Sequence, residues 1–139
     1  MRAFSQSISP MARGLAAYVR TVAEAVGVPE EAVDFEVSDT ATAYLGLARR
    51  WRNRPEHDLM LVWSERHGWS LAAETEPTQD PVVLAHFGPD LVPAPAEVAR
   101  FVTDVLAGHG RGRPRPDLSV ADDRARLTEL LGAYLPGPR

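Results

Sequence analysis

The stretch 58–75, DLMLVWSERHGWSLAAET, decides the fold of this chain, because two segments with alternating apolar residues flank a short turn. The segments are 58–64 and 69–74, and the turn between them ends in Gly68. Alternation with a period of two is typical of a half-buried strand, and glycine readily takes the positive φ that tight turns often require. The stretch predicts an antiparallel β-hairpin with one face in the core.

The same period of two occurs on both sides of this hairpin. Residues 33–37 alternate apolar and polar side chains, and a second strand is predicted over 41–47 after a short turn. A last apolar strand is predicted over 81–86. Five strands joined by short connections predict a meander sheet.

Three amphipathic segments surround the strands. Residues 11–26 and the segment from Pro95 to Gly108 have apolar residues at spacings of three and four, which predicts helices. A Gly, Arg and Pro linker over 108–118 leads to a closing helix over 119–135. We therefore predict an α+β domain over 1–107, with a five-stranded, largely antiparallel meander sheet, the N-terminal and post-sheet helices on one face, and a tethered C-terminal amphipathic helix.

Residue parity assigns side chains to the two faces of the predicted sheet. The odd-numbered residues of the first four strands are all apolar, so they form the core face. The even-numbered residues form what we call the second face, which is polar at its ends but holds Tyr44, Met60 and Val62 at its centre. A cover for this centre is expected, and it could be the closing helix, a second copy of the chain or another partner. The partner-binding candidates are Tyr44, Met60, Val62, Leu127, Leu130, Leu131 and Tyr134.

The composition excludes several classes of protein. The 139 residues are 45% hydrophobic and 24% charged, as in one ordinary globular domain. The chain has no cysteine, which excludes disulfides, thiolate metal sites and a cysteine nucleophile. Residues 1–10 lack a signal-peptide core, and no apolar run reaches the roughly 18 residues that span a bilayer. We expect a cytoplasmic protein with no membrane partner.

Arginine is concentrated in two short clusters on a chain with a formal net charge of -4. Residues 49–58 carry a net +2 and residues 111–116 a net +3. The segment 48–57 lacks periodicity and is predicted as a solvated loop, in which Trp51 either stacks on bases beside phosphate-binding guanidinium groups or folds back onto the core. The candidates for contact with nucleic acid or an acidic partner are Arg49, Arg50, Trp51, Arg52 and Arg54.

Residues with catalytic or metal-binding chemistry do not form a recognisable site in the sequence. Ser64 and Asp58 would lie roughly 20 Å apart in one strand, too far for a shared triad. The four histidines are scattered without the spacing of a metal site. No catalytic residue, cofactor or metal is predicted.

Four stretches resemble a family of small actinobacterial proteins of unknown function. They are GLAAYVRTVAEAVGV (14–28), DTATAYLGLA (39–48), DLMLVWSERHGWSLAAET (58–75) and VLAHFGPDLVPAPAEVARFV (83–102). The resemblance covers roughly residues 11–107 and implies an actinobacterial, cytoplasmic origin. It brings no activity and no site residues.

These observations favour a non-enzymatic partner-binding or regulatory module that acts through the second face or the C-terminal helix. Its partner is expected to be another protein or a second copy of the chain. Two alternatives remain open: a nucleic-acid or nucleotide-binding accessory protein that uses residues 49–54, and a small-ligand-binding domain with a pocket between helix and sheet.

Overall fold

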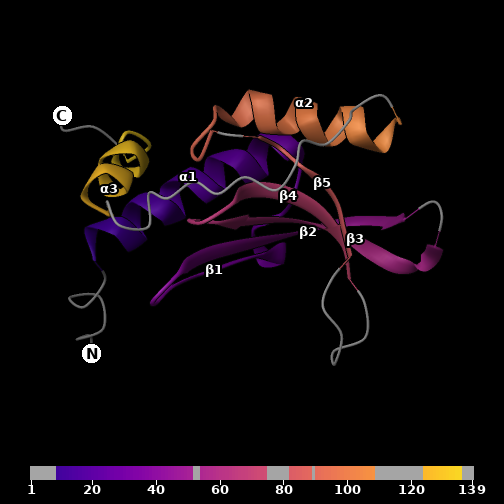
Figure 1. Cartoon of the computed structure of the whole chain (residues 1–139), viewed down its shortest axis with the longest axis horizontal. Helices are drawn as coiled ribbons and strands as arrows, with labels where there is room; N and C mark the ends of the chain where they lie inside the picture. Colours follow the sequence, from indigo (N-terminus) through magenta and orange to yellow (C-terminus); the bar gives the residue numbers. More distant parts are fainter. Residues whose placement is uncertain (1–8, 52–53, 75–81, 89, 109–123, 136–139) are drawn as a thin grey trace.

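The computed structural model describes residues 9–51, 54–74, 82–88, 90–108 and 124–135, without the side chains of residues 51 and 54–56. A five-stranded antiparallel sheet in the order β1-β2-β3-β4-β5 has its helices on one face (Figure 1). The predicted α+β fold class and meander order are confirmed. The helices are α1 (Pro10–Val26), α2 (Pro95–Leu106) and α3 (Arg124–Gly132), with a short 3-10 helix η2 (Glu30–Ala32); the strands are β1 (Val33–Val37), β2 (Ala41–Trp51), β3 (Arg54–Ser64), β4 (Gly68–Ala73) and β5 (Val82–His86).

Local signals fix both ends of α1. Ser9 is the N-cap, and its Oγ accepts a hydrogen bond from the backbone N–H of Ala12 at 3.1 Å. Pro10 occupies the first turn, where a missing N–H costs nothing. Gly27 ends the helix with φ of 89°, a conformation that glycine adopts without strain. These caps fix where α1 begins and ends, and its buried residues Leu15, Tyr18 and Val22 belong to the core cluster.

The core face of the sheet is as predicted. Trp63 and Trp69 are opposite each other in β3 and β4, and both are fully buried. The Trp69 Nε1–H donates to the Tyr18 hydroxyl of α1 at 3.0 Å, and this hydroxyl donates to the Pro93 carbonyl at 2.6 Å. Burial raises the pKa of Tyr18 well above its ordinary value. These bonds join α1, the sheet and the segment before α2.

The closing helix packs on the chain's own core. Leu127 and Leu131 of α3 are fully buried in the cluster that also contains Leu15 of α1. Gly14 permits the close approach, because a Cβ at this position would lie 3.0 Å from the Leu131 Cβ. The helix therefore lies beside α1 on the helix side of the sheet, and the predicted alternative that it covers the second face is wrong. Residues 109–123, which include most of the predicted linker and the start of the predicted helix, lie outside the described residues.

The predicted loop over 48–57 is also wrong. Strands β2 and β3 are each eleven residues long and extend into this segment. The backbone of Trp51 pairs with that of Arg54 at the far end of the hairpin. Register shifts between Gly46 and Trp51, with Ala48 at a φ of 56°, explain why no regular period is visible there. Cross-strand pairing outweighs the low strand propensity of this segment.

Candidate functional site

Strand β1 forms one edge of the sheet and lies at the side of the molecule opposite β5. Its residues Val33, Phe35 and Val37 are on the core face, yet Phe35 is 39% exposed and both valines are only partly buried. The backbone N–H of Phe35 is bonded to the Asp34 carboxylate at 2.9 Å instead of to a neighbouring strand. Helix α1 therefore leaves the outermost strand incompletely covered.

A groove separates β1 from α1 on the helix side. It has a volume of about 590 Å³ and is lined by small and apolar side chains along its floor, with charged groups at its rim. Phe35 and Val33 line its strand side, and Ala16 and Ala23 line its helix side. The groove therefore offers space next to β1 for side chains of an additional segment.

A smaller hollow lies beside the same strand on the second face. It has a volume of about 200 Å³, and Phe35 also borders it, together with Tyr44 and Val62 of the neighbouring strands. The Tyr44 hydroxyl donates a hydrogen bond to the Glu74 carboxylate. Burial, followed by this acidic partner and its negative charge, raises the pKa of Tyr44 to about 12. The tyrosine is thus a neutral donor held in place at one wall of the hollow.

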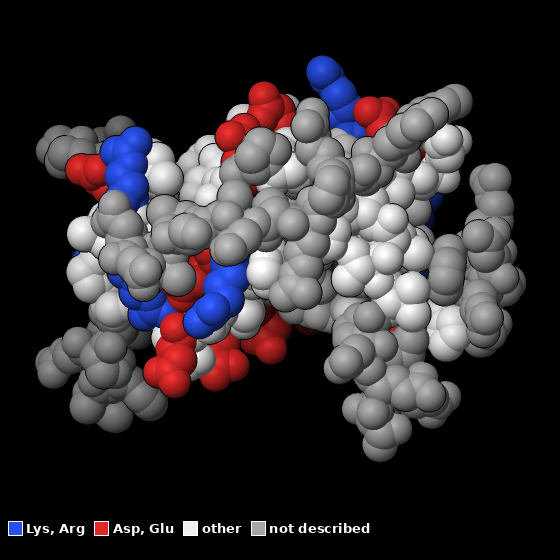
Figure 2. Space-filling model, viewed as in Figure 1, with Lys and Arg blue, Asp and Glu red and all other residues white. Residues whose placement is uncertain are grey.

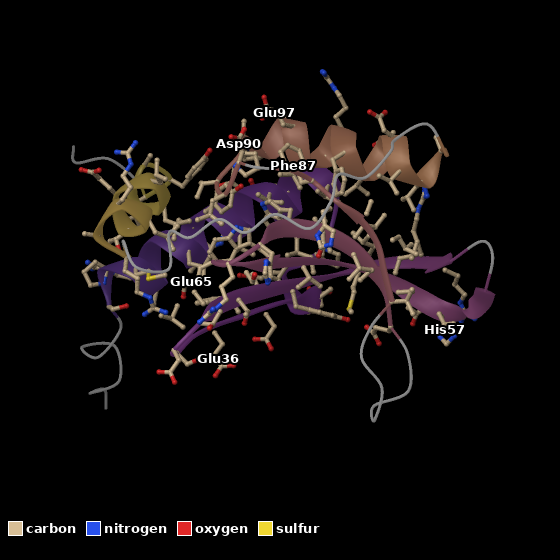
Figure 3. The ribbon with its side chains drawn as sticks, viewed as in Figure 1. Glu36, His57, Glu65, Phe87, Asp90 and Glu97 are labelled. Atoms are coloured by element: carbon tan, nitrogen blue, oxygen red, sulfur yellow. The ribbon has the colours of Figure 1, made fainter. Side chains whose placement is uncertain are left out.

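The surroundings of β1 are acidic. Residues 21–48 contain six acidic residues and no arginine or lysine. Asp34 and Glu36 belong to β1 itself and are exposed, and Figure 3 shows Glu36 pointing away from the sheet. Figure 2 shows acidic side chains along the lower edge of the molecule, where β1 lies in Figure 1. Arg20 is the cation at the groove, and its guanidinium lies 4.0 Å from Glu30.

The other partner-binding candidates lie in two places, on the second face of the sheet and in the C-terminal segment that contains α3. Met60 is 5% exposed at the centre of the second face, and Val62 beside it is partly buried. Leu130 and Tyr134 are partly buried, and the Tyr134 ring lies 4.8 Å from that of Tyr18. The apolar stripe of α3 thus has contacts within the chain, whereas Tyr44 and Val62 border a hollow.

The arginine candidates do not form one cluster. Arg49 and Arg50 are exposed in β2, and Arg50 pairs with Asp58 at 3.7 Å on the second face. Arg49 lines a separate hollow of about 310 Å³ on the helix side, together with Thr103 of α2. Trp51 and Arg54 are placed by their backbones in β2 and β3, and Arg52 lies outside the described residues.

One ion pair was not predicted from the sequence. Glu65, in the turn between β3 and β4, is 1% exposed and accepts a hydrogen bond from the backbone N–H of Ala41 at 2.6 Å. The Arg124 guanidinium of α3 lies 2.6 Å from the same carboxylate and also donates to the Ser38 and Asp39 carbonyls. Figure 3 shows Glu65 near the end of the sheet that faces α3. A charged residue in a polar turn gives no sequence signal of such burial.

Residues considered for catalysis have structural contacts. The Ser64 Oγ accepts a hydrogen bond from the backbone N–H of His67 at 3.0 Å, so this serine caps the turn after β3. Within the described ranges, no group of three or more histidine, aspartate or glutamate side chains is placed to hold a metal ion. The same part of the chain has no helix that is long and apolar enough to cross a membrane.

The chain belongs to DUF6292, a family of unknown function, whose sequence profile matches residues 18–104. The matched range contains all five strands, the second half of α1 and most of α2, and it ends before α3. Both β1 with its two hollows and the long β2–β3 hairpin are therefore within the family domain. Neither a curated protein nor a solved structure matches the chain.

Proposed function

We propose that this chain is a non-enzymatic protein-binding module that docks an extended, basic segment of another protein along the outer edge of β1. The observation that carries the proposal is Phe35. It belongs to the core face of the sheet, is nevertheless 39% exposed, and borders hollows on both faces of the same strand. Its position between two hollows supports the proposal, because exposed apolar surface beside a concave site favours binding of a partner.

The edge of β1 suits strand addition. An edge strand presents backbone N–H and C=O groups that another chain can pair with. The Phe35 N–H is bonded only locally, to the Asp34 carboxylate, so a docked strand could replace that bond at small cost. An added strand sends alternate side chains to opposite faces. One set would enter the 590 Å³ groove and the other the 200 Å³ hollow.

Charge identifies the kind of segment. The six acidic residues within 21–48 outnumber the arginines placed beside this segment, Arg20 at the groove and Arg124 at the Ser38 and Asp39 carbonyls, so they favour a basic partner over an acidic one. Apolar side chains on the docked strand would contact Phe35 and Val33, while arginine or lysine would lie near the carboxylates of Asp34 and Glu36. The proposed occupant is thus an extended segment in which basic and apolar residues are mixed.

We also propose that the protein comes from an actinobacterium and is located in the cytoplasm. An actinobacterial source fits the use of arginine at every basic position, which is common when codons are rich in G and C. A cytoplasmic location fits a cysteine-free chain, because disulfides are rare in that compartment.

The test is affinity purification of the tagged chain from the organism that encodes it, with two matched variants. Phe35→Asn alters the proposed edge. Val83→Asn is the control, because Val83 is 47% exposed in β5, the strand at the opposite edge. We expect a protein with a basic extended segment to be retained by the wild type and by the Val83 variant and to be lost with Phe35→Asn. Equal retention by all three chains would contradict docking at β1.

A further inference from the structure

We infer that the hollow between strand β2 and the C-terminal ends of α1 and α2 binds a free apolar amino acid. Val26 ends α1, Leu106 ends α2, and both line the hollow together with Leu47 of β2. In Figure 1 both helices run from left to right, so these ends lie toward the same side of the molecule. The volume is about 310 Å³. Because a water molecule takes about 30 Å³ in the liquid, there is room for about ten non-hydrogen atoms, the size of leucine or isoleucine.

Strand β2 is distorted where it borders the hollow. Its pairing with β3 shifts register between Gly46 and Arg50. Within this shift Ala48 has a φ of 56°, a strained conformation for a residue other than glycine. Bulges and strained residues are over-represented beside functional sites, where they redirect side chains. Leu47 and Arg49, on either side of Ala48, both line the hollow.

Arg49 brings a positive charge that the protein does not neutralise locally. It is exposed, and none of the described residues forms an ion pair or a hydrogen bond with it. The next residue, Arg50, instead pairs with Asp58 at 3.7 Å on the second face. Among the described residues, the lining of the hollow includes no acidic side chain, and Asp104 of α2 is exposed outside it. A guanidinium group in this position suits the carboxylate of a ligand.

The two helix ends supply the opposite polarity. The C-terminus of a helix carries a partial negative charge, because its last carbonyl groups lack partners within the helix. Both α1 and α2 end at the hollow, and neither has a basic residue in its last turn. An ammonium group is favourable at such an end, whereas a simple anion is repelled. A ligand with both a carboxylate and an ammonium group therefore fits the hollow.

The remaining walls of the hollow are apolar. Val102 is 6% exposed, and Val26, Leu47 and Leu106 are partly buried against the core. These aliphatic side chains suit a hydrocarbon group of the ligand. The class of ligand is therefore an amino acid with an aliphatic side chain, such as leucine. The hollow shares no lining residue with the groove at β1, so this inference is independent of the proposed docking there.

The test is a titration of L-leucine into the full chain, followed by amide chemical shifts in NMR spectra. We expect saturable shifts at Val26, Leu47 and Leu106. Three related molecules each lack one part of the ligand: leucinamide lacks the carboxylate, N-acetylleucine the ammonium group, and glycine the hydrocarbon side chain. Each should bind about tenfold more weakly or worse, because it loses a charged or an apolar contact.

Two neighbouring variants test the role of Arg49. Arg49→Met keeps the apolar part of the side chain but removes the guanidinium group, so leucine should bind about tenfold more weakly. Arg50→Met is the matched control, because Arg50 lies on the opposite face of the same strand, and the affinity should change less than about twofold. Circular dichroism confirms that each variant is folded.

Several results would overturn the inference. Leucine might give no saturable shifts up to about 10 mM, well above the dissociation constant expected for a ligand of this size. Arg49→Met and Arg50→Met might bind leucine equally well. Binding of leucinamide as tight as that of leucine would remove the role of the carboxylate, and equal binding of N-acetylleucine would assign the hollow to a simple carboxylate instead of an amino acid.

Discussion

Replacing Arg124 with methionine tests how α3 is attached to the body of the protein. Methionine keeps the apolar part of the side chain but leaves the Glu65 carboxylate, which is 1% exposed, with the Ala41 N–H as its remaining strong donor. Removing one partner of a buried pair costs about 3–5 kcal/mol. Because the Arg124 side chain is itself 38% exposed, water screens the pair, and we expect a loss of about 2–3 kcal/mol in the free energy of unfolding.

The assay is urea unfolding followed by tryptophan fluorescence, with two further variants. Glu65→Gln keeps an acceptor for the Ala41 N–H and should cost less, about 1–2 kcal/mol. Arg126→Met is the control, because Arg126 and Glu129 form an exposed pair at 3.0 Å on the same helix and such pairs contribute less than about 1 kcal/mol. A loss below about 0.5 kcal/mol for Arg124→Met would refute the reasoning and leave α3 held by its leucines.

Three further predictions concern the core, the second face and the C-terminal segment. Trp63→Ala should cost about 3–5 kcal/mol in chemical denaturation, because it leaves a cavity and removes the 2.8 Å bond to the Leu91 carbonyl; a loss below about 1 kcal/mol would contradict the core-face assignment. The raised pKa of Tyr44 means that its neutral hydroxyl stabilises the fold below pH 10 and that this contribution is lost as the pH rises toward 12. The stability advantage of the wild type over Tyr44→Phe should therefore shrink across that range, and a constant advantage would refute the shift. Truncation after Arg115 should expose the apolar face of α1 and increase the binding of a hydrophobic dye, whereas unchanged dye binding would contradict the packing of α3.

The regular alternation of apolar and polar residues along the strands made most of the sheet predictable from the sequence. The parity of 58–64 and 69–74 placed Trp63 and Trp69 in the core, and Gly68 has the expected positive φ of 72°. The far end of the β2–β3 hairpin was not predicted because its strands contain a register shift and residues with low strand propensity, so that a loop and a paired strand look alike in sequence. Whether such a segment is a strand depends on backbone pairing with a strand elsewhere in the chain, here of β2 with β3.

The candidate site was only partly predictable. Parity placed Phe35 on the core face, but it gave no information on how far α1 extends over the edge strand. Tyr44 and Val62 were candidates from the second face, and they border one of the two hollows. The Arg124–Glu65 pair joins residues 59 positions apart, so no local pattern could show it. These features depend on how whole elements pack.

Amide hydrogen exchange at Phe35 tests the central claim most directly. The chain is compared free and bound to the partner recovered by the wild-type bait, with Val83 in β5 as the reference position. Strand addition at β1 would slow the exchange of the Phe35 N–H by about tenfold or more and leave the Val83 N–H unchanged. Unchanged exchange at Phe35 in a saturated complex would contradict the claim that β1 is the docking edge.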